Sequence, residues 1–566
     1  MKWIVVITLL LVLLGHAQIV EWIHRYNGPD NLSEWPYDIT VDTSGNVYVC
    51  GFGYLTATYM DYLTIKYNSS GDTVWLRYYD GGQLFYDRAH AIAIDDSGNV
   101  YVTGLSIESG NQYDIATIKY NSAGVEQWVA RYNGPGNDDD EAYDIAIDDS
   151  GYIYVCGYTR SAATFTDYIT LKYDRYGDTV WTSTYNGPFN GIDIAYALAL
   201  DDSGNVYVTG SGNSATYDND YYTIKINAVG DTQWVVAYDG TAATAYDYAN
   251  DIALGGGYIY VTGESDGAGT EADYATIKYS PAGDTLWEMR YNGPGNGDDN
   301  ANGIVADSLG NVFVTGGSMG PVQTDYATIK YNFSGNVEWV SRYNGPDDDI
   351  DEAFDIVLDH MGNVYVAGQS YATQPYTPEF DFLTIKYNAS GVEQWTHRYN
   401  GTGDSQDHLY DMAVDDAGNV YVTGSSIGNI GYDDIVTIKY GVTGINEEAG
   451  NAVCEIPFNL TASPNPFHYQ TRIRFTIPDA GCMIEEANQG ISGSVGGTSE
   501  YQKPGLTIYD ATGRLVKQWD YPAMRLSDHI SWDGTDRSDR QLGSGVYFLR
   551  LTVGDYQETH QLLLIR

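Results

Sequence analysis

Clusters of carboxylates stand out among the residues whose chemistry could serve a function. Three of them directly follow a Tyr-Asn-Gly-Pro turn or come a few residues after one. Carboxylate and amide oxygens gathered in a loop suit calcium, which takes about six to eight oxygen ligands in variable geometry. None of the clusters has EF-hand spacing, so two interpretations stay open: calcium loops, or solvated acidic runs. The candidate calcium ligands are Asp138, Asp139, Asp140 and Glu141, then Asp298 and Asp299, then Asp347, Asp348 and Asp349.

Residues suited to acid–base or nucleophilic catalysis form no recognisable motif. His90, His360, His397 and His408 are scattered without the spacing of zinc ligands, and no nucleophile elbow occurs. Carboxylates are so abundant that a pair suited to glycoside hydrolysis has many possible positions. We therefore assign no catalytic residue and no certain cofactor, and we expect a noncatalytic binding protein. The alternative is a secreted carbohydrate-active or other hydrolytic enzyme with acidic residues at its centre.

The overall charge argues against one class of partner. The chain has 76 acidic and 28 basic residues and a net charge of -48. Proteins that bind nucleic acid need cationic groups that displace counterions from the phosphates. We therefore expect no nucleic-acid partner, and the acidic surface suits an extracellular protein.

A tryptophan recurs at a nearly fixed period along most of the chain. The spacing is 53 residues, except for one interval of 52 and one of 56. Each period holds four short segments rich in β-branched and aromatic residues, which is typical of four antiparallel strands. Eight such units predict an all-β, eight-bladed β-propeller over residues 18–440. The recurring residues are Trp22, Trp75, Trp128, Trp181, Trp234, Trp287, Trp339 and Trp395.

The two ends of the repeat predict how the ring closes. The first segment, residues 21–27, matches the fourth strand of a unit, whereas the repeat stops at residues 437–440, which match a third strand. The N-terminal strand is therefore expected to complete the last blade. This pairing would remove an exposed sheet edge, which otherwise invites aggregation.

One face of the ring is expected to bind the ligand. All variation in unit length lies between the second and third strands, whereas the turns after the first and third strands are short and rich in Gly, Asn and Asp. In an antiparallel blade the variable loops share a face with the connections between blades. Loops on a rigid scaffold commonly carry function, so we expect an extracellular glycan or protein ligand on that face.

Residues that recur in every unit are expected to belong to the scaffold, because one site has no use for eight copies. The tryptophans are expected to wedge between blades. The lysine of each third strand is expected to pair with a carboxylate of its own blade. These lysines are Lys66, Lys119, Lys172, Lys225, Lys278, Lys330, Lys386 and Lys439.

The N-terminus and the cysteines indicate export. Residues 1–17 hold one charge, an apolar run and a small-residue exit, which is typical of a signal peptide cleaved after Ala17. No other stretch approaches the roughly 18 apolar residues of a transmembrane helix, so the mature chain is expected to have no membrane span.

Cys50 and Cys156 occupy one position of two different units and are expected to be buried thiols. Cys454 and Cys482 are candidates for a disulfide.

The repeat unit resembles a known family. Its motif, Asp-x-Ser-Gly-Asn-Val-Tyr-Val-Thr-Gly followed by Asp-Tyr-x-Thr-Ile-Lys-Tyr, is similar to that of the bacterial SBBP β-propeller repeat proteins. That family is named for seven blades, whereas this chain has eight units. The resemblance implies a propeller and an exported protein and specifies no activity.

The C-terminal region resembles a sorting domain. After a linker at residues 441–455, residues 456–566 contain alternating strand segments with turn signals, among them Trp532-Asp-Gly and Ser544-Gly-Val-Tyr-Phe. They are similar to the Ig-like C-terminal domain of type IX secretion cargo. The resemblance implies that the outer-membrane secretion machinery is a partner, and that the protein is secreted or displayed on the surface of a bacterium with an outer membrane. We expect a monomer.

Overall fold

The chain forms two compact units in the computed structural model, Met1–Glu447 and Glu448–Arg566. Every regular element among the described residues is a β-strand. None of these residues belongs to a helix long and apolar enough to cross a membrane. The described residues are 19–441 without 83–85, 108–111, 162–163, 215–217, 242–245, 347, 374–377, 402–404 and 429–430, and then 459–463, 471–476, 505–510, 514–519, 529–537, 540–553 and 556–565.

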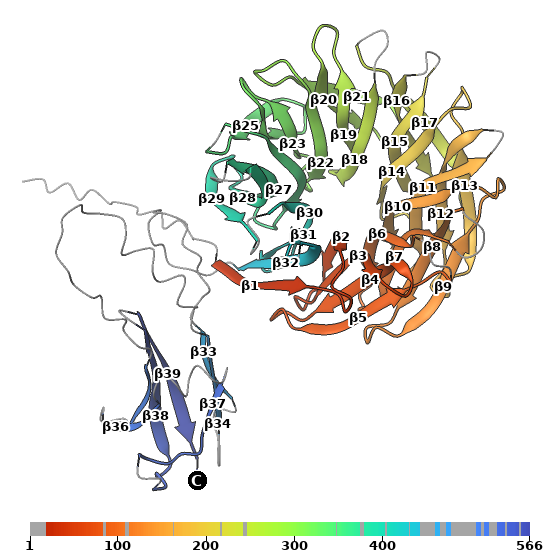
Figure 1. Ribbon diagram of the computed structural model, residues 1–566. Helices are drawn as coiled ribbons and strands as arrows, with labels where there is room; N and C mark the ends of the chain where they lie inside the picture. Colours follow the sequence, from red (N-terminus) through yellow and green to blue (C-terminus); the bar gives the residue numbers. More distant parts are fainter. Residues whose placement is uncertain are drawn as a thin grey trace, which may run out of the picture. The chain divides into compact units, whose positions relative to one another are not determined.

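Eight four-stranded antiparallel sheets in the first unit are arranged as the blades of a propeller (Figure 1). This arrangement confirms the predicted all-β, eight-bladed fold. Blade 1 consists of β2 (Glu34–Val41), β3 (Val47–Leu55), β4 (Tyr59–Tyr67) and β5 (Thr73–Tyr79). Blade 2 consists of β6 (Arg88–Ile94), β7 (Val100–Ser106), β8 (Asp114–Tyr120) and β9 (Glu126–Tyr132). Blade 3 consists of β10 (Asp140–Ile147), β11 (Ile153–Ser161), β12 (Phe165–Tyr173) and β13 (Thr179–Tyr185). Blade 4 consists of β14 (Asp193–Leu200), β15 (Val206–Asn213), β16 (Asn219–Ile226) and β17 (Thr232–Tyr238).

The remaining blades repeat this order. Blade 5 consists of β18 (Asp247–Gly255), β19 (Tyr258–Asp266), β20 (Ala272–Tyr279) and β21 (Thr285–Tyr291). Blade 6 consists of β22 (Asp299–Ala306), β23 (Val312–Met319), β24 (Thr324–Tyr331) and β25 (Val337–Tyr343). Blade 7 consists of β26 (Asp351–Leu358), β27 (Val364–Thr373), β28 (Pro378–Tyr387) and β29 (Glu393–Tyr399). Blade 8 consists of β30 (Asp407–Val414), β31 (Val420–Ile427), β32 (Asp433–Gly441) and β1 (Ile19–Tyr26). The first-named strand of each blade lies innermost and contacts its counterparts in the neighbouring blades.

The N-terminal strand provides the fourth strand of blade 8. β1 pairs antiparallel with β32. Blade 8 also contacts blade 1 directly, because the Asp411 carboxylate accepts the Ile39 N–H at 2.8 Å and Trp22 Nε1 donates to the Ser69 carbonyl at 3.2 Å. The two ends of the repeat therefore meet in one sheet, and that sheet packs against the first blade.

The recurring tryptophans wedge between blades. Seven of the eight indoles, all but Trp395, lie against a turn glycine of the next blade, and at Gly71 (φ 82°) an added Cβ would stand 2.7 Å from the Trp22 ring, so only glycine fits there. The indole N–H also donates to a carbonyl of that turn at 3.0–3.2 Å. The pairs are Trp22–Ser69, Trp75–Ser122, Trp128–Arg175, Trp181–Ala228, Trp234–Pro281, Trp287–Phe333 and Trp339–Ala389.

The recurring lysines differ from the prediction. Among the described residues, only Lys330 and Lys439 form an ion pair with a carboxylate of their own blade. The ammonium groups instead lie over an aromatic ring of the second strand, as Lys66 does over Tyr48 at 4.8 Å. Several also donate to a carbonyl of the next blade. A cation–π contact and a carbonyl satisfy a half-buried ammonium group without a second charge.

The second unit contains two sheets of an Ig-like domain. One sheet has the order β33 (Asn459–Ser463), β34 (Thr471–Thr476) and β37 (His529–Trp532), and the other has the order β36 (Leu515–Trp519), β35 (Gly505–Asp510), β38 (Gly545–Val553) and β39 (Tyr556–Leu564). Trp532 is buried against Tyr547, with ring centroids 5.3 Å apart, and its indole N–H donates to the Thr535 carbonyl. Leu506, Ile508, Val516, Leu549, Leu562 and Leu564 are also buried.

Two of the four cysteines are described. Cys50 and Cys156 are buried free thiols, as predicted, and burial raises the pKa of both well above its usual value. Cys454 and Cys482 lie outside the described residues, as do the predicted signal peptide and the predicted linker beyond Gly441.

Candidate functional site

Every innermost strand contains a β-bulge at the same position. The register of its pairing with the second strand shifts there by one residue. One residue of the innermost strand is therefore left without a partner in the second strand. A bulge bends the strand and changes the direction of the extra side chain. In order from blade 1 to blade 8, the bulged residues are Tyr37, His90, Tyr143, Tyr196, Asn250, Asn302, Phe354 and Tyr410.

Five of these residues form a continuous row of rings, which we call the aromatic arc: Tyr410, Tyr37, His90, Tyr143 and Tyr196. Ring centroids are 5.8 Å apart between Tyr410 and Tyr37, 5.0 Å between Tyr37 and His90, 5.6 Å between His90 and Tyr143, and 5.8 Å between Tyr143 and Tyr196. All five side chains are half-buried. The arc therefore presents partly accessible rings from five consecutive blades, 8 and 1 to 4.

One member of the aromatic arc, His90, contacts the carboxylate of Glu141. His90 Nε2 is 2.9 Å from Glu141 Oε1, and each side chain is 14% exposed. The other carboxylate oxygen accepts the hydroxyl groups of Tyr143 at 3.2 Å and Tyr158 at 3.0 Å. Burial alone would raise the pKa of Glu141, but His90 and the two hydroxyl groups outweigh burial and lower it. Glu141 is thus held as a carboxylate among aromatic rings.

Blades 5 and 6 present polar groups at the same level. Asn250 and Asn302 occupy the bulges, and each donates its side-chain N–H to a carbonyl of the next innermost strand, at 2.9 and 2.8 Å. Glu264 and Glu352 are half-buried nearby; burial raises the pKa of both, and neighbouring carboxylates raise that of Glu264 further. The centre of the ring is therefore aromatic on one side and polar on the other.

Where the residue after the bulge is an aspartate, it connects one blade to the next. Asp144 accepts the N–H of Ile145 in its own strand at 2.7 Å and that of Leu198 in the next blade at 2.8 Å. Asp251 and Asp355 make the same two bonds in their blades. In order from blade 1 to blade 8, this position holds Asp38, Ala91, Asp144, Ala197, Asp251, Gly303, Asp355 and Asp411.

Blade 8 breaks this alternation of aspartate with a small residue. Asp411 is hydrogen-bonded to the carboxyl groups of Asp38 and Asp355, and such contacts between carboxyl groups require shared protons. Burial and the adjacent carboxyl groups raise the pKa of Asp355 and Asp411 well above its usual value, and burial raises that of Asp38 to about 6. Three adjacent carboxyl groups thus join blades 7, 8 and 1.

The first predicted calcium cluster is largely committed to protein contacts. Asp140 is fully buried and accepts the backbone N–H groups of Gly134 and Arg160. Asp138 and Asp139 lie 3.9 and 3.6 Å from the Arg160 guanidinium. Glu141 belongs to the aromatic arc instead.

The other two predicted clusters lie at different blade junctions. Asp299 is buried and accepts the N–H groups of Gly293 and Met319, whereas Asp298 is exposed. Asp348 and Asp349 accept hydrogen bonds from Asn344 and Ile350, and Asp347 lies outside the described residues. The structure does not bring the three clusters together, and calcium binding by each loop stays a prediction.

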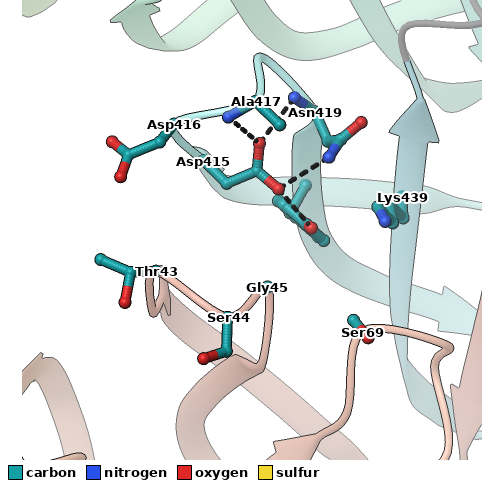
Figure 2. A pocket seen from close by; sticks show the side chains of 10 residues that line it. Thr43, Ser44, Gly45, Ser69, Asp415, Asp416, Ala417, Asn419 and Lys439 are labelled. Atoms are coloured by element: carbon teal, nitrogen blue, oxygen red, sulfur yellow. Dashed lines mark hydrogen bonds between the residues drawn. The ribbon is translucent and has the colours of Figure 1, made fainter.

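A shallow pocket at the junction of blades 8 and 1 belongs to the scaffold (Figure 2). Asp415 lines it, but its carboxylate accepts the N–H groups of Ala417 and Asn419 and the Tyr421 hydroxyl. The same aspartate-capped turn recurs in other blades, for example at Asp42. Because this turn recurs around the ring, the pocket has no feature that distinguishes the junction of blades 8 and 1 from the other junctions.

Sequence reasoning missed the aromatic arc, although a signal for it exists. The bulged residue follows the recurring tryptophan by 15 residues, or by 16 in blade 5. Aligning the units at this position shows Tyr or His in the blades of the arc and Asn in blades 5 and 6. The spacing cannot show that the residue is unpaired, because the bulge is a property of strand pairing.

The central carboxyl groups predict how stability depends on pH. Burial raises the pKa of Asp144 and Asp251 to about 7, whereas an aspartate in an unfolded chain titrates near pH 4. The folded chain therefore binds more protons between about pH 4 and 7, and its free energy of unfolding falls as the pH rises through this window. We expect a lower melting temperature at pH 8.5 than at pH 6.5, measured by differential scanning calorimetry.

Two variants test whether the central carboxyl groups cause this pH dependence of stability. Asp411→Ala leaves Asp38 to bond the Ile39 N–H and removes one of three adjacent carboxyl groups, so the melting temperature should change less between the two pH values. Asp144→Ala also deprives two N–H groups of their acceptor, so it should destabilise at both pH values, by about 1–3 kcal/mol for each group, in addition to weakening the pH dependence. An unchanged pH dependence in Asp411→Ala would contradict the assignment.

Comparison with known families identifies both parts of the chain. The SBBP family, described as "Beta-propeller repeat", matches residues 21–51, 75–110, 127–162, 289–320 and 394–431. The family described as "FlgD Ig-like domain" matches residues 483–555. These matches agree with the blades and the Ig-like sheets.

Individual relatives are distant. An uncharacterized WD repeat-containing protein, L264, of Acanthamoeba polyphaga mimivirus is 24% identical over 469 residues, which cover 69% of this chain and 33% of that protein. The chain thus spans about a third of that relative's length. A solved ulvan lyase of polysaccharide lyase family PL25 is 15% identical, with a TM-score of 0.37, over 62% of this chain and 92% of its own. PorZ, a surface component of the type IX secretion system of Porphyromonas gingivalis, is 11% identical, with a TM-score of 0.17, over 96% of this chain and 100% of its own. The chain therefore contains SBBP-type β-propeller repeats, folded as blades, followed by a region that matches the FlgD Ig-like domain.

Proposed function

We propose that the chain is a secreted or cell-surface propeller that acts as a noncatalytic binding scaffold, with an extracellular glycan or protein ligand at the aromatic arc. The observation that carries this proposal is the row of half-buried rings from Tyr410 to Tyr196, which replaces the amides found in blades 5 and 6. The arc lies near the start of the innermost strands, next to the loops that join consecutive blades.

The chemistry of the site favours a neutral glycan among these ligands. Tyrosine combines an apolar ring, which packs against the apolar face of a sugar, with a hydroxyl group that bonds to polar groups. Carboxylates such as Glu141 and Glu352 accept hydrogen bonds from sugar hydroxyl groups. A ligand rich in carboxylate or sulfate groups would meet like charges at this site, because the chain has a net charge of -48.

A hydrolytic or other carbohydrate-active enzyme is the alternative, and the His90–Glu141 pair favours it. A histidine 2.9 Å from a carboxylate in a partly accessible site is an arrangement that general acid–base catalysis uses. The two functions share the same surface, so they are distinguished by turnover and not by binding.

Tyr143→Ala tests the site. Tyr143 contacts His90 and Tyr196 and donates to Glu141, so its loss should weaken binding of a neutral oligosaccharide at least tenfold, or about 1.4 kcal/mol, measured by isothermal titration calorimetry after a glycan screen. The matched control is Tyr176→Ala, an exposed tyrosine in the tight turn between β12 and β13.

Equal affinity of Tyr143→Ala and Tyr176→Ala would place the ligand elsewhere. Product formation by the parent that disappears in Glu141→Gln, while binding persists, would establish the enzyme instead of the scaffold.

We further propose that residues 456–566 direct export through outer-membrane secretion machinery, after the signal peptide at residues 1–17 has acted. The resemblance of the Ig-like region to sorting domains supports this role. In a bacterium with type IX secretion, a chain that ends before residue 456 should accumulate in the periplasm, measured by fractionation and immunoblotting. Export of the truncated chain at the parent's level would refute the proposal.

A further inference from the structure

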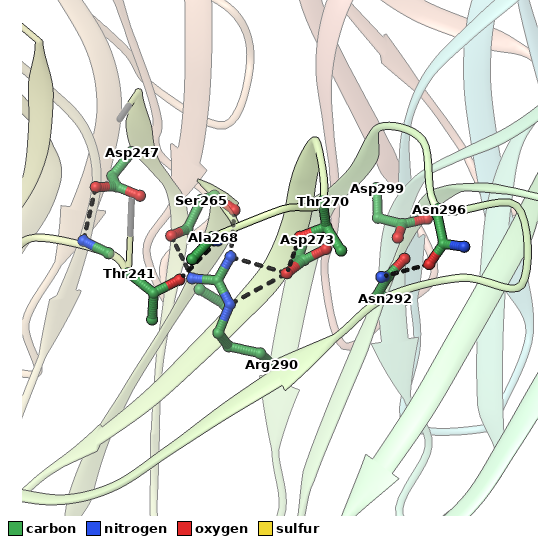
Figure 3. A network of polar contacts seen from close by, with 12 residues as sticks. Thr241, Asp247, Ser265, Ala268, Thr270, Asp273, Arg290, Asn292, Asn296 and Asp299 are labelled. Carbon is green, nitrogen blue, oxygen red and sulfur yellow. Dashed lines mark hydrogen bonds and ion pairs between the residues drawn. The ribbon is translucent and has the colours of Figure 1, made fainter. Parts of the chain in front are cut away.

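An arginine neutralises the aspartate of the third strand in four blades. It comes from the neighbouring fourth strand, and the shortest N–O distances are 2.8–3.1 Å. In blade 5, Arg290 lies between Asp273 and Ser265 (Figure 3). The pairs are Arg25–Asp434, Arg290–Asp273, Arg342–Asp325 and Arg398–Asp381.

Blades 1 and 4 have lost this arginine, with Tyr78 and Ala237 in its place. The same two blades carry a second change. The Asn of the Tyr-Asn-Gly turn that follows the fourth strand is Asp80 after blade 1 and Asp239 after blade 4, whereas the other six units keep Asn. A positive charge is thus removed and a negative charge added at the same two junctions.

The result is two equivalent groups of three carboxylates, which we call the aspartate triads. One consists of Asp61, Asp80 and Asp87, and the other of Asp220, Asp239 and Asp247. Within each triad, one ligand atom from each residue lies within 4.8 Å of the others. Each triad takes its residues from a third strand, from the turn between blades and from the start of the next innermost strand, which Asp87 directly precedes and Asp247 begins.

The triads have no direct ion pair with a cation of the described residues, although Arg290 binds Ser265, the strand neighbour of Asp247. No lysine or arginine of the described residues lies within 4.0 Å of any of the six carboxylates, in contrast to the four arginine-paired blades. Arg131 of blade 2 donates to Tyr79 and Ser106 instead.

A buried carboxylate oxygen in each triad also lacks a hydrogen-bond partner. Asp61 is 2% exposed, and its Oδ1 accepts no hydrogen bond from the described residues. Asp220 of the other triad is 8% exposed, and none of the described residues donates a hydrogen bond to it. A buried charged oxygen without a partner is costly, so a group that binds it stabilises the fold.

We propose that each aspartate triad binds one calcium ion, which replaces the lost arginine charge. Calcium prefers carboxylate oxygens and tolerates irregular geometry, and waters complete its coordination on the exposed side, where Asp80 and Asp239 lie. These sites differ from the acidic loops predicted from the sequence. They are also separate from the aromatic arc, so they do not depend on the proposed ligand.

Blade 3 provides an internal comparison. It too lacks the arginine, with Thr184 at that position, but it keeps Asn186 in the turn. Its junction therefore has only Asp167 and Asp193, which do not form a triad with a third carboxylate. The loss of arginine alone does not create the site.

Calcium stoichiometry of the purified full chain tests the proposal. After chelator treatment and dialysis against millimolar calcium, we expect two bound ions per chain beyond non-specific uptake, measured by inductively coupled plasma mass spectrometry and by calorimetric titration. Asp80→Asn and Asp239→Asn should each bind one ion fewer, and the double variant should bind two fewer. Both variants restore the residue that the other units carry and lie at exposed positions, so they should fold.

Asp178→Asn is the matched control, because it removes an exposed carboxylate from the turn between β12 and β13, outside the triads and the acidic loops, and it should bind as many ions as the parent. Undiminished calcium binding by the double variant would overturn the proposal, as would a parent chain that binds no calcium. Replacing calcium with magnesium at the same concentration should give weaker binding, because magnesium demands stricter octahedral geometry.

Discussion

Contact between the innermost strands is the constraint on which the rest of the propeller depends. After each bulge a backbone N–H group points away from its own sheet and needs an acceptor. Asp144, Asp251 and Asp355 each satisfy two such groups, one in their own strand and one in the next blade. Because one aspartate serves two blades, the next blade can hold a small residue, and the ring alternates Asp with Ala or Gly up to blade 7.

The alternation of aspartate with a small residue ends at blade 8, which has Asp411 between the aspartates of blades 7 and 1. Asp411 supplies the acceptor for Ile39 and thereby connects the last blade to the first. It also lies between Asp38 and Asp355, so protons must be shared where the chain ends meet. On the outside of the ring, the Trp22 indole makes the same junction as the other tryptophans. The last junction is therefore built from the same contacts as the others, with additional carboxyl groups at its centre.

Function is expected where the units differ, because the repeated contacts already have structural roles. The aromatic arc uses the bulge position, which the scaffold leaves unpaired, and the aspartate triads use a position where the scaffold elsewhere has an arginine. Both departures change side chains without changing strand pairing. This explains how a regular ring can hold local sites at a few blades.

The sequence predicts the fold well because the tryptophan contacts require a fixed spacing, and that spacing is visible in the chain. It predicts sites poorly, and the reasons are specific. Asp140 and Asp299 look like calcium ligands within acidic runs, yet among the described residues neither belongs to a group of three carboxylates, unlike Asp87 and Asp247 at the same repeat position. The lysines look like ion-pair partners, yet among the described residues only Lys330 and Lys439 form an ion pair, whereas all eight ammonium groups lie over a ring of the adjacent strand. Asp80 and Asp239 stand alone in the sequence, and only the fold brings each to two other carboxylates.

Anomalous diffraction from crystals grown with calcium, or with terbium in its place, tests most directly whether departures from the repeat mark the working sites. The account predicts one peak between Asp61, Asp80 and Asp87, a second between Asp220, Asp239 and Asp247, and none at the arginine-paired junctions. Peaks confined to the acidic loops at residues 138–141 and 347–349, with both triads empty, would contradict it.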